Sequence, residues 1–364
     1  MPVRIAIAGG GTGGHLFPGI AIAEEFLKRD PQSPVIFIGT KRGIEHRLLG
    51  PLGYELKEID VEGLKGRGIK ALIKGVYAIP NSMLQSRRIL ADFRPDVVIG
   101  VGGYASGPAV LTAYLMGIPT AIAEQNALAG NTNRILGKVV RKVFVTYEQS
   151  KNLFAARKVT VTGNPVRAAI AAGLTQIKEK KAGRRILIFG GSQGAATINR
   201  TVVAMLPLLQ KIKDQVSIVH QTGDRDLAEA AQAYEQYGIE ARVSPFIVDM
   251  VSAYQAADLI ICRAGATSLA EITVAGKASI LIPFPFAADD HQTLNAKAMV
   301  EAGAAAMIRE SDLTAEKLYS VVENLLGDDQ KLRDMEAKSK KLGRPDAAAR
   351  IVDACLQLAS TYKH

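Results

Sequence analysis

The sequence predicts an α/β protein made of two doubly wound, Rossmann-like domains, and three observations predict this fold class. A length of 364 residues exceeds one ordinary core, so two domains are expected. Short aliphatic runs alternate with stretches of helical length, which is typical of parallel sheets covered by helices on both faces. Residues 4–10 (RIAIAGG) and 185–191 (RILIFGG) align at an offset of 181, which indicates a duplicated unit with a ligand cleft between the copies.

Continuous apolar runs, rich in Val and Ile, mark the expected buried strands along the chain. In the first half these strands are expected at 3–8, 35–39, 96–101, 119–123 and 142–146. In the second half they are expected at 185–190, 216–220, 259–262, 278–282 and 305–309. The Gly-Asn-Pro sequence within 161–166 predicts the linker. We therefore expect domains over 1–163 and 164–340, and a last segment over 341–364 with a helix from Ala347 to Leu358.

The composition indicates a globular protein with an anionic partner. Hydrophobic residues make up 48% of the chain, which excludes disordered and collagen-like classes. Its two cysteines, Cys262 and Cys355, show no metal or disulfide spacing, which fits a reducing compartment. No apolar run reaches the length of a membrane span, and the N-terminus lacks a signal-peptide layout. The net charge of +10 lies mostly in residues 1–164, where 21 basic residues face 12 acidic ones.

The first glycine-rich turn, GGGTGGH at 9–15, predicts an anion site. Glycines let a ligand approach the backbone, and the helix expected from Pro18 to Lys28 would direct its N-terminal N–H groups there. The turn matches the dinucleotide pattern GxGxxG. That pattern requires an acid at the end of the second strand, and no carboxylate follows before Glu45. A nicotinamide or flavin cofactor is therefore disfavoured.

Two more glycine-rich turns follow expected strands, GGYASGP at 102–108 and GGSQGA at 190–195. The second turn should lie beside the first, because both end central strands of one sheet. Turns in both halves suggest two phosphate-bearing ligands that face each other. The alternative is that the glycines only allow tight turns between strand and helix.

Three polar groups in the second half have both a binding and a structural interpretation. Glu271, in RAGATSLAE, would accept hydrogen bonds from both hydroxyls of a ribose, or would form a capping box with Ser268. His291 and Gln292 would reach a sugar, or would be solvated residues at a helix start. The acids of 224–226 read DxD, but acids are expected at a helix start, and the structural interpretation is preferred.

Taken together, the motifs resemble the MurG family of bacterial N-acetylglucosaminyltransferases, which act in peptidoglycan synthesis. The resemblance runs over nearly the whole chain, in order. It rests on GGGTGGHLFPG (9–19), GGYASGP (102–108), EQN (124–126), GNPVR (163–167), GGSQGA (190–195) and RAGATSLAE (263–271). It implies a GT-B fold with a deep interdomain cleft and a last helix that returns to the first domain. It also implies transfer of N-acetylglucosamine from UDP-GlcNAc to the C4 hydroxyl of membrane-anchored lipid I, with inversion, to give lipid II.

The resemblance assigns the donor to the second domain and the acceptor to the first. Glu271 would bind the ribose, and backbone at Phe246 and Ile247 would bind uracil. The diphosphate and sugar of the donor would be held by Asn126, Arg167, Gly191, Ser192, Gln193, Gly194, Ala266, Thr267, Ser268, His291 and Gln292. The acceptor would be held by Thr12, Gly13, Gly14, His15, Tyr104, Ser106 and Asn133, of which Thr12, Gly13 and Gly14 would also meet the donor.

Two positions depart from some relatives, and the base has two candidates. Ala123 stands where some relatives have histidine, and His291 where some have glutamine. His15 titrates near neutrality and is one candidate for the general base, or it orients the acceptor phosphate. Glu124 is the other candidate, with a structural role in its turn as the alternative. The helix N-terminus and Arg167 would stabilise the departing diphosphate, so neither a metal nor another cofactor is expected.

A basic, apolar segment predicts docking to an anionic lipid surface. Between Glu62 and Asp92 there are six basic residues and no acidic residue. The residues expected at the membrane are Lys65, Ile69, Lys70, Leu72, Ile73, Val76 and Tyr77. The alternative is an ordinary amphipathic helix packed on the sheet. The resemblance places the protein peripherally on the cytoplasmic face of the inner membrane, with other cell-wall synthesis proteins as further partners.

Two rival functions are weaker. A UDP-sugar 2-epimerase would share the fold and the donor site, but it has no use for GGYASGP or for the basic apolar segment. A nucleic-acid binder would explain the charge, yet aromatic residues are 5% of the chain, Trp is absent and no nucleic-acid motif occurs, so nucleic acid is not expected as a partner.

Overall fold

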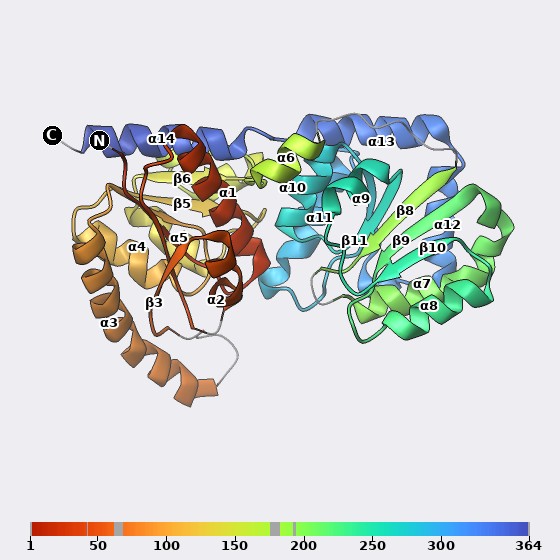
Figure 1. Cartoon of the computed structure of the whole chain (residues 1–364), viewed down its shortest axis with the longest axis horizontal. Helices are drawn as coiled ribbons and strands as arrows, with labels where there is room; N and C mark the ends of the chain where they lie inside the picture. Colours follow the sequence, from red (N-terminus) through yellow and green to blue (C-terminus); the bar gives the residue numbers. More distant parts are fainter. Residues whose placement is uncertain (1, 42, 62–67, 175–182, 192–193, 363–364) are drawn as a thin grey trace. The chain divides into compact units, whose positions relative to one another are not determined.

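The computed structural model describes residues 2–41, 43–61, 68–174, 183–191 and 194–362, without the side chains of 68–78. The chain forms two compact units (Figure 1). The first comprises Met1–Ala168 with Arg344–His364, and the second comprises Ala169–Gly343.

The first unit is built on a seven-stranded parallel sheet with the order β3-β2-β1-β4-β5-β6-β7. The strands are β1 (Ile5–Ala8), β2 (Val35–Gly39), β3 (Glu55–Glu58), β4 (Val97–Gly100), β5 (Thr120–Glu124), β6 (Lys142–Val145) and β7 (Val159–Val161). The helices are α1 (Gly13–Arg29), α2 (Glu45–Leu48), α3 (Gly68–Phe93), α4 (Ser106–Leu115), α5 (Asn131–Val139) and α14 (Ala347–Thr361).

The second unit has a six-stranded parallel sheet with the order β10-β9-β8-β11-β12-β13. Its strands are β8 (Arg184–Phe189), β9 (Val216–Gln221), β10 (Ala241–Ser244), β11 (Leu259–Cys262), β12 (Ala278–Leu281) and β13 (Ala306–Met307). Its helices are α6 (Ala168–Leu174), α7 (Ala196–Leu209), α8 (Leu227–Gln236), α9 (Met250–Ala256), α10 (Ala266–Ala275), α11 (His291–Glu301), α12 (Ala315–Leu326) and α13 (Asp329–Leu342).

The two sheets repeat the same doubly wound strand order, to which the first adds β7. This confirms the predicted fold class of two Rossmann-like units. In each sheet the order reverses between the first and fourth strands, β1 beside β4 and β8 beside β11. Ligands of such sheets bind where the order reverses, outside the carboxyl ends of these strands. The three glycine-rich turns lie at these ends.

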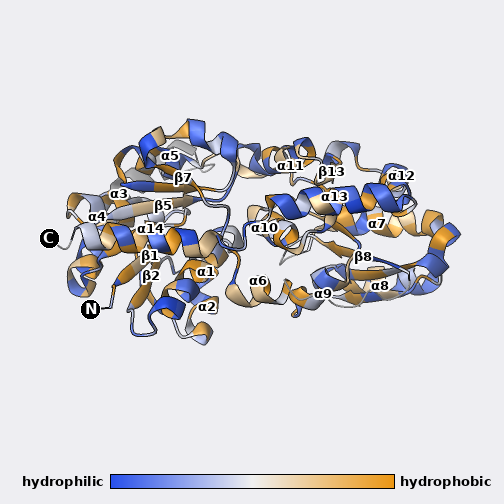
Figure 2. Cartoon of the chain, turned by 90° about the horizontal axis from the view of Figure 1, so that it is seen from above, coloured by the Kyte–Doolittle hydropathy of each residue, from blue (hydrophilic) through white to orange (hydrophobic). Residues whose placement is uncertain are grey.

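Alternating side chains of β1 serve the two faces of the first sheet. Ile5 and Ile7 pack with α1 and with Ile351 of α14, whereas the smaller Ala6 and Ala8 pack on the face covered by α4. The last helix therefore belongs to the core of the first unit, and it lies along α1 in Figure 1. It shows orange and blue residues in Figure 2, as expected for a helix with one buried face.

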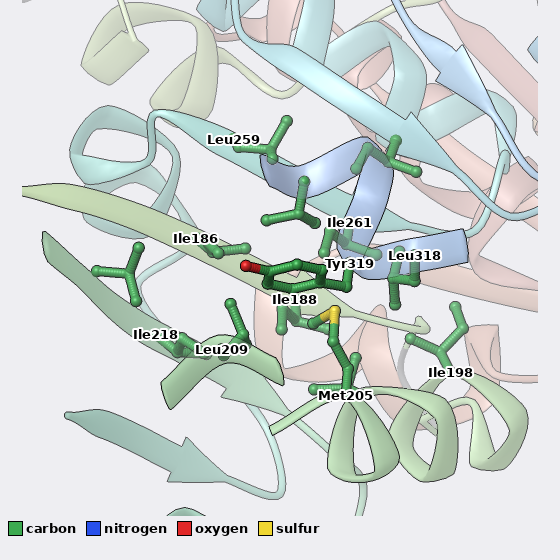
Figure 3. Close-up of a cluster of buried hydrophobic side chains, with 14 of the residues drawn as sticks. Ile186, Ile188, Ile198, Met205, Leu209, Ile218, Leu259, Ile261, Leu318 and Tyr319 are labelled. Atoms are coloured by element: carbon green, nitrogen blue, oxygen red, sulfur yellow. The ribbon is translucent and has the colours of Figure 1, made fainter. Parts of the chain in front are cut away.

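The core of the second unit lies between the sheet and helices α7, α8 and α12. Strands β8 and β11 supply isoleucines to it, and α12 supplies Leu318 and Tyr319 (Figure 3). Cys262 of β11 and Cys355 of α14 are both buried and free. Burial raises the pKa of both thiols, so neither is a reactive thiolate. Within the described part of the chain, no helix has the length and hydrophobicity needed to cross a bilayer.

Three expectations from the sequence need correction. Helix α1 begins at Gly13, not at Pro18, so Gly13, Gly14 and His15 form its first turn. Strands β3, β7 and β10 were not expected, and all three lie at sheet edges. The last strand, expected over 305–309, is only Ala306–Met307.

Candidate active site

The first two glycine-rich turns are in direct backbone contact at the ends of β1 and β4. A Cβ atom at Gly9 would overlap the carbonyl oxygen of Gly102, and one at Gly103 would overlap that of Gly10. Gly9, Gly10, Gly102 and Gly103 all have positive φ, which favours glycine. The prediction that the second turn lies beside the first is confirmed.

Helix α1 starts directly after the first turn. Thr12 is its N-cap in an extended conformation, without a side-chain cap bond. The first N–H groups of a helix have no partner within it, and they carry the positive end of its dipole. Gly13 and Gly14, which lack side chains, therefore provide an approachable site for an anion.

His15 lies on this helix turn against the second glycine turn. A Cβ atom at Gly102 would come within 2.7 Å of its Nδ1 atom, so only glycine leaves room for the ring. The same nitrogen is 3.4 Å from Oε1 of Gln125. Gln125 is buried and donates through Nε2 to the carbonyl oxygens of Val101 (3.2 Å) and Ala123 (3.1 Å), which directs Oε1 toward the histidine.

Glu124, at the end of β5, is buried and braces the turn that follows. It accepts hydrogen bonds from the backbone N–H of Asn126 (3.0 Å) and of Gly130 (3.1 Å). The amide of Asn133 also donates to it, at 2.9 Å, and to the carbonyl of Ala123 at 3.2 Å. This geometry favours the structural interpretation of Glu124 and gives Asn133 the same role.

Three other residues of the first unit that were expected to contact a ligand differ from one another in exposure and in their neighbours. Tyr104 is 55% exposed on the second turn, where a ligand can reach it. Ser106 is fully buried, and a Cβ atom at Gly100 would overlap its hydroxyl, so this side chain faces β4. The Arg167 guanidinium lies 4.7 Å from the centre of the Phe17 ring of α1, a cation–π contact that fixes its charge near the start of that helix.

In the second unit, Gln221 at the end of β9 joins the third glycine turn to the segment expected to bind uracil. Its Nε2 donates to the carbonyl of Gly191 at 2.8 Å, and its Oε1 accepts from the N–H of Ile247 at 2.9 Å. A Cβ atom at Gly194 would overlap the carbonyl of Thr222, so the turn packs tightly on β9. Phe246 is 55% exposed. Ser192 and Gln193 lie outside the described residues.

Glu271 lies on the second turn of α10, with 9% of its surface exposed. The hydroxyl of Tyr254, a fully buried side chain of α9, donates to its Oε2 atom at 2.9 Å. Helix α10 starts at Ala266 with Gly265 as N-cap and no side-chain cap bond. Ser268 is thus inside the helix, and the capping-box interpretation of Glu271 is wrong. Thr267 precedes Ser268 in the same helix, and the Thr267 hydroxyl is buried with no hydrogen-bond partner among the described residues.

Helix α11 begins with the two remaining expected residues. The side chain of Gln292 accepts a hydrogen bond from the N–H of Phe284 at 3.0 Å. The segment that follows β12 therefore orients the Gln292 amide. His291 is half-buried, and its Nδ1 lies 2.7 Å from the carbonyl oxygen of Ala288. Of the DxD acids, Asp226 is the N-cap of α8, as its structural interpretation predicts, and it accepts hydrogen bonds from Arg225 (2.9 Å) and Asn199 (2.8 Å). The described residues contain no group of three metal-ligating side chains.

Sequence reasoning missed several polar side chains that hold these elements in place. Glu45 contacts the first turn, Gln125 contacts His15, and Tyr254 contacts Glu271. Arg263 is ion-paired with Glu310 and donates to the carbonyl of Ile282 at 3.2 Å. Glu45 had a signal in the sequence, as the first acid after the second strand. Tyr254 had none, because its helix gives no indication of what its hydroxyl meets.

The expected membrane-facing residues are only partly described. Lys65 lies outside the described residues. Ile69, Lys70, Leu72, Ile73, Val76 and Tyr77 fall within α3, but their side chains are not described. The predicted contact with lipid therefore stays a prediction.

Comparisons with known proteins agree with this architecture. The model of the glycosyltransferase family 28 N-terminal domain matches residues 5–145, and that of the C-terminal domain matches 185–351. A protein of Syntrophus aciditrophicus is 56% identical over 98% of this chain and 99% of its own length. One of Myxococcus xanthus is 51% identical over 98% and 93%. Both are named UDP-N-acetylglucosamine–N-acetylmuramyl-(pentapeptide) pyrophosphoryl-undecaprenol N-acetylglucosamine transferase.

Solved structures give the same picture. Acinetobacter baumannii MurG superposes with a TM-score of 0.81 and 33% identity, covering 98% of this chain and 100% of that one. UDP-GlcNAc 2-epimerase from Neisseria meningitidis, bound to UDP-GlcNAc, superposes with a TM-score of 0.68 over 98% and 100%. Its identity of 16% makes this a likeness of fold alone.

Proposed function

The chain belongs to glycosyltransferase family 28, and we propose that it transfers N-acetylglucosamine from UDP-GlcNAc to the C4 hydroxyl of lipid I, which yields lipid II and UDP. The observation that carries this proposal is the 56% identity, over nearly the full length of both chains, with a protein named as that transferase. The geometry of the two units supports it, because each places a glycine turn where its strand order reverses.

The second unit would bind the donor. Glu271, oriented by Tyr254, accepts hydrogen bonds from the ribose hydroxyls, since an ionised carboxylate is an acceptor only. The N–H of Ile247 already donates to Gln221, so it is not available to uracil. The N–H of the uracil ring would instead donate to the backbone carbonyl of Ile247. The turn at Gly191 and Gly194 and the N-terminus of α10 would face the diphosphate and the sugar.

The first unit would bind the acceptor. Its diphosphate would contact the N–H groups at the start of α1, where Gly13 and Gly14 allow close approach. Tyr104, exposed on the adjoining turn, would contact the sugar. The charge supports this assignment, because the net positive charge of the chain is concentrated in residues 1–164 and the acceptor is an anionic lipid.

His15 is the side chain that we assign as general base. In the neutral ring one nitrogen donates and the other accepts. Oε1 of Gln125 faces Nδ1, which keeps the proton on that nitrogen and makes Nε2 the acceptor. The C4 oxygen would attack C1 of the donor sugar while Nε2 takes its proton. The bond from C1 to the diphosphate breaks on the opposite side, which inverts the configuration.

The departing UDP takes the bonding electron pair, so its diphosphate gains negative charge. Fixed N–H dipoles at the helix starts and the guanidinium of Arg167 would stabilise that charge. Arg167 is suited to this because its contact with Phe17 holds it in place without neutralising it. We propose that these groups take the role that a divalent metal has in other transferases.

The protein would act as a peripheral protein on the cytoplasmic face of the inner membrane, where its lipid acceptor is anchored. The basic, apolar sequence at the start of α3 supports this location. Flotation with vesicles tests it. Binding that rises with anionic lipid and falls with salt is expected, and binding indifferent to both would contradict electrostatic docking.

The test of the function uses labelled UDP-GlcNAc with and without a lipid I analogue. Transfer of label to the lipid, dependent on the analogue, is expected. A 2-epimerase would instead convert UDP-GlcNAc alone to its C2 epimer. Appearance of that epimer without a lipid product would replace the proposed activity by the rival one.

A further inference from the structure

Glu45 places a buried carboxylate inside the first glycine turn. The residue opens helix α2 and has 1% of its surface exposed. Its Oε2 accepts from the N–H of Gly11 at 2.7 Å. Its Oε1 accepts from both the N–H and the hydroxyl of Thr40, at 2.9 and 3.0 Å. These short bonds are of the charge-assisted kind, which are stronger than neutral ones.

Three glycines from separate segments make room for this carboxylate. A Cβ atom at Gly10 would come within 2.6 Å of its carboxyl carbon, and one at Gly39 within 2.8 Å of its Cγ. A Cβ atom at Gly43 would overlap the carboxylate itself. Gly10 and Gly11 have positive φ angles of +137° and +85°, a backbone conformation that favours glycine. The hydrogen bond from Gly11 to Glu45 helps to hold the turn in this conformation. The Glu45 side chain thus fits only because all three surrounding positions are glycine.

The third glycine turn is bonded to a neutral side chain instead. There Gln221, at the end of the second strand of its own unit, bonds to the carbonyl of Gly191. The second unit thus uses an amide that donates to a backbone carbonyl, whereas the first uses a carboxylate that accepts from a backbone N–H. The negative charge of the Glu45 carboxylate, bonded to the N–H of Gly11, disfavours a phosphate at that N–H group. It leaves the N–H groups of Gly13 and Gly14 as the position for an anion.

We propose that Glu45 is a positioning residue for the acceptor, an inference that rests on the proposed function. By bonding to Gly11 and Thr40 it holds the first glycine turn and the start of α1 in the arrangement that meets the acceptor diphosphate. It touches no substrate. Its loss therefore impairs use of the acceptor, whereas the donor unit keeps its affinity for UDP-GlcNAc.

The variant Glu45→Gln tests this with little change in volume. Its amide oxygen can accept from Thr40, but its NH₂ group then faces the N–H of Gly11, donor against donor. We expect kcat/KM for the lipid I analogue to fall by about 10²-fold, the size of effect that a displaced binding group produces. The Kd for UDP-GlcNAc should stay within about twofold of that of the unsubstituted enzyme, because the hydrogen bonds of Glu45 lie within the first unit and the donor-binding residues of the second unit are unchanged.

Glu25→Gln is the matched control, since Glu25 is also a buried glutamate of the first unit, bonded to Arg29 on α1 at 2.7 Å. It should keep kcat/KM for the acceptor. A Glu45→Gln enzyme with unchanged acceptor kinetics would overturn the proposal. So would one that loses donor affinity by the same factor, because that result indicates general loss of structure.

Amide hydrogen exchange provides a readout that needs no catalysis. The peptide spanning 9–16 should exchange faster in Glu45→Gln than in the unsubstituted protein, and the peptide spanning 194–209 should not change. Equal exchange at 9–16 would refute the positioning role. If the unsubstituted protein transfers no sugar, the proposed function fails, while the exchange result still decides whether Glu45 holds the turn.

Discussion

Replacing Tyr254 by Phe should weaken binding of UDP-GlcNAc by removing one hydroxyl. That hydroxyl lies 2.9 Å from Oε2 of Glu271, and its ring is fully buried. A hydrogen bond to a charged group contributes about 1.5–3 kcal/mol. Glu271 keeps 9% of its surface exposed, so water can replace part of the lost bond and the low end of this range applies. We expect an affinity loss of about 10-fold, equivalent to about 1.4 kcal/mol.

Calorimetric titration with UDP and with a 2′,3′-dideoxy analogue measures this effect. The preference for UDP over the analogue should shrink in Tyr254→Phe, because a less fixed carboxylate binds the ribose hydroxyls less well. Tyr319→Phe is a suitable control. That tyrosine belongs to the core of the same unit (Figure 3), and its hydroxyl donates to Glu323 of the same helix at 2.6 Å. An unchanged affinity and preference in Tyr254→Phe would refute the argument that Tyr254 orients Glu271.

Three further predictions follow from other parts of the molecule. His15→Ala should lower kcat by about 10²-fold or more as the base is lost; an unchanged kcat with a raised KM for the acceptor would make His15 a binding residue. Burial lowers the pKa of His220 to about 4 from an ordinary value near 6.5, so below pH 6.5 the unfolded chain binds a proton that the folded chain does not. Urea unfolding should therefore show a free energy that falls by about 1.5 kcal/mol between pH 6.5 and pH 5, and His220→Asn should lack this slope. EDTA should leave the transfer rate unchanged, and a rate restored only by Mg²⁺ would contradict stabilisation of the diphosphate by Arg167 and helix N-termini alone.

The interior of the fold was predictable because buried parallel strands are continuous apolar runs. β1, β4 and β8 are of this kind, and the turns after them carry the glycines that their close approach requires. The strands that escaped prediction are β3 (ELKE), β7 (VTV) and β10 (ARVS). Each has one free edge, so it needs fewer apolar residues, and its sequence resembles that of a loop.

The start of α1 escaped prediction for a related reason. Gly13 and Gly14 are poor helix formers by themselves, and they were assigned to the turn. In the structure they are the first helical residues, and the absence of a side chain at Gly13 leaves room for the ring of Phe17 and for Ile44, which a Cβ atom there would approach to 3.1 and 3.9 Å. Tertiary packing overrides local propensity here.

The candidate site was predictable in the residues proposed to contact ligands and not in those that pack behind them. Glycine turns and Glu271 could be found from motif and position, because ligand contacts require particular residue types at fixed places. Glu45, Gln125 and Tyr254 act on these residues through space, across sequence separations of 34, 110 and 17 residues. A single sequence contains no signal for the partners of Gln125 and Tyr254, and for Glu45 it shows only that this is the first acid after the second strand.

The most direct test of the central claim is the structure of the product formed from UDP-GlcNAc and a lipid I analogue. We predict one disaccharide-bearing lipid for each UDP released, with N-acetylglucosamine joined to C4 of the muramoyl sugar in the β configuration, as measured by NMR. An α linkage would contradict the inverting displacement assigned to His15. Release of UDP without any sugar on the lipid would contradict the assignment of the acceptor to the first unit.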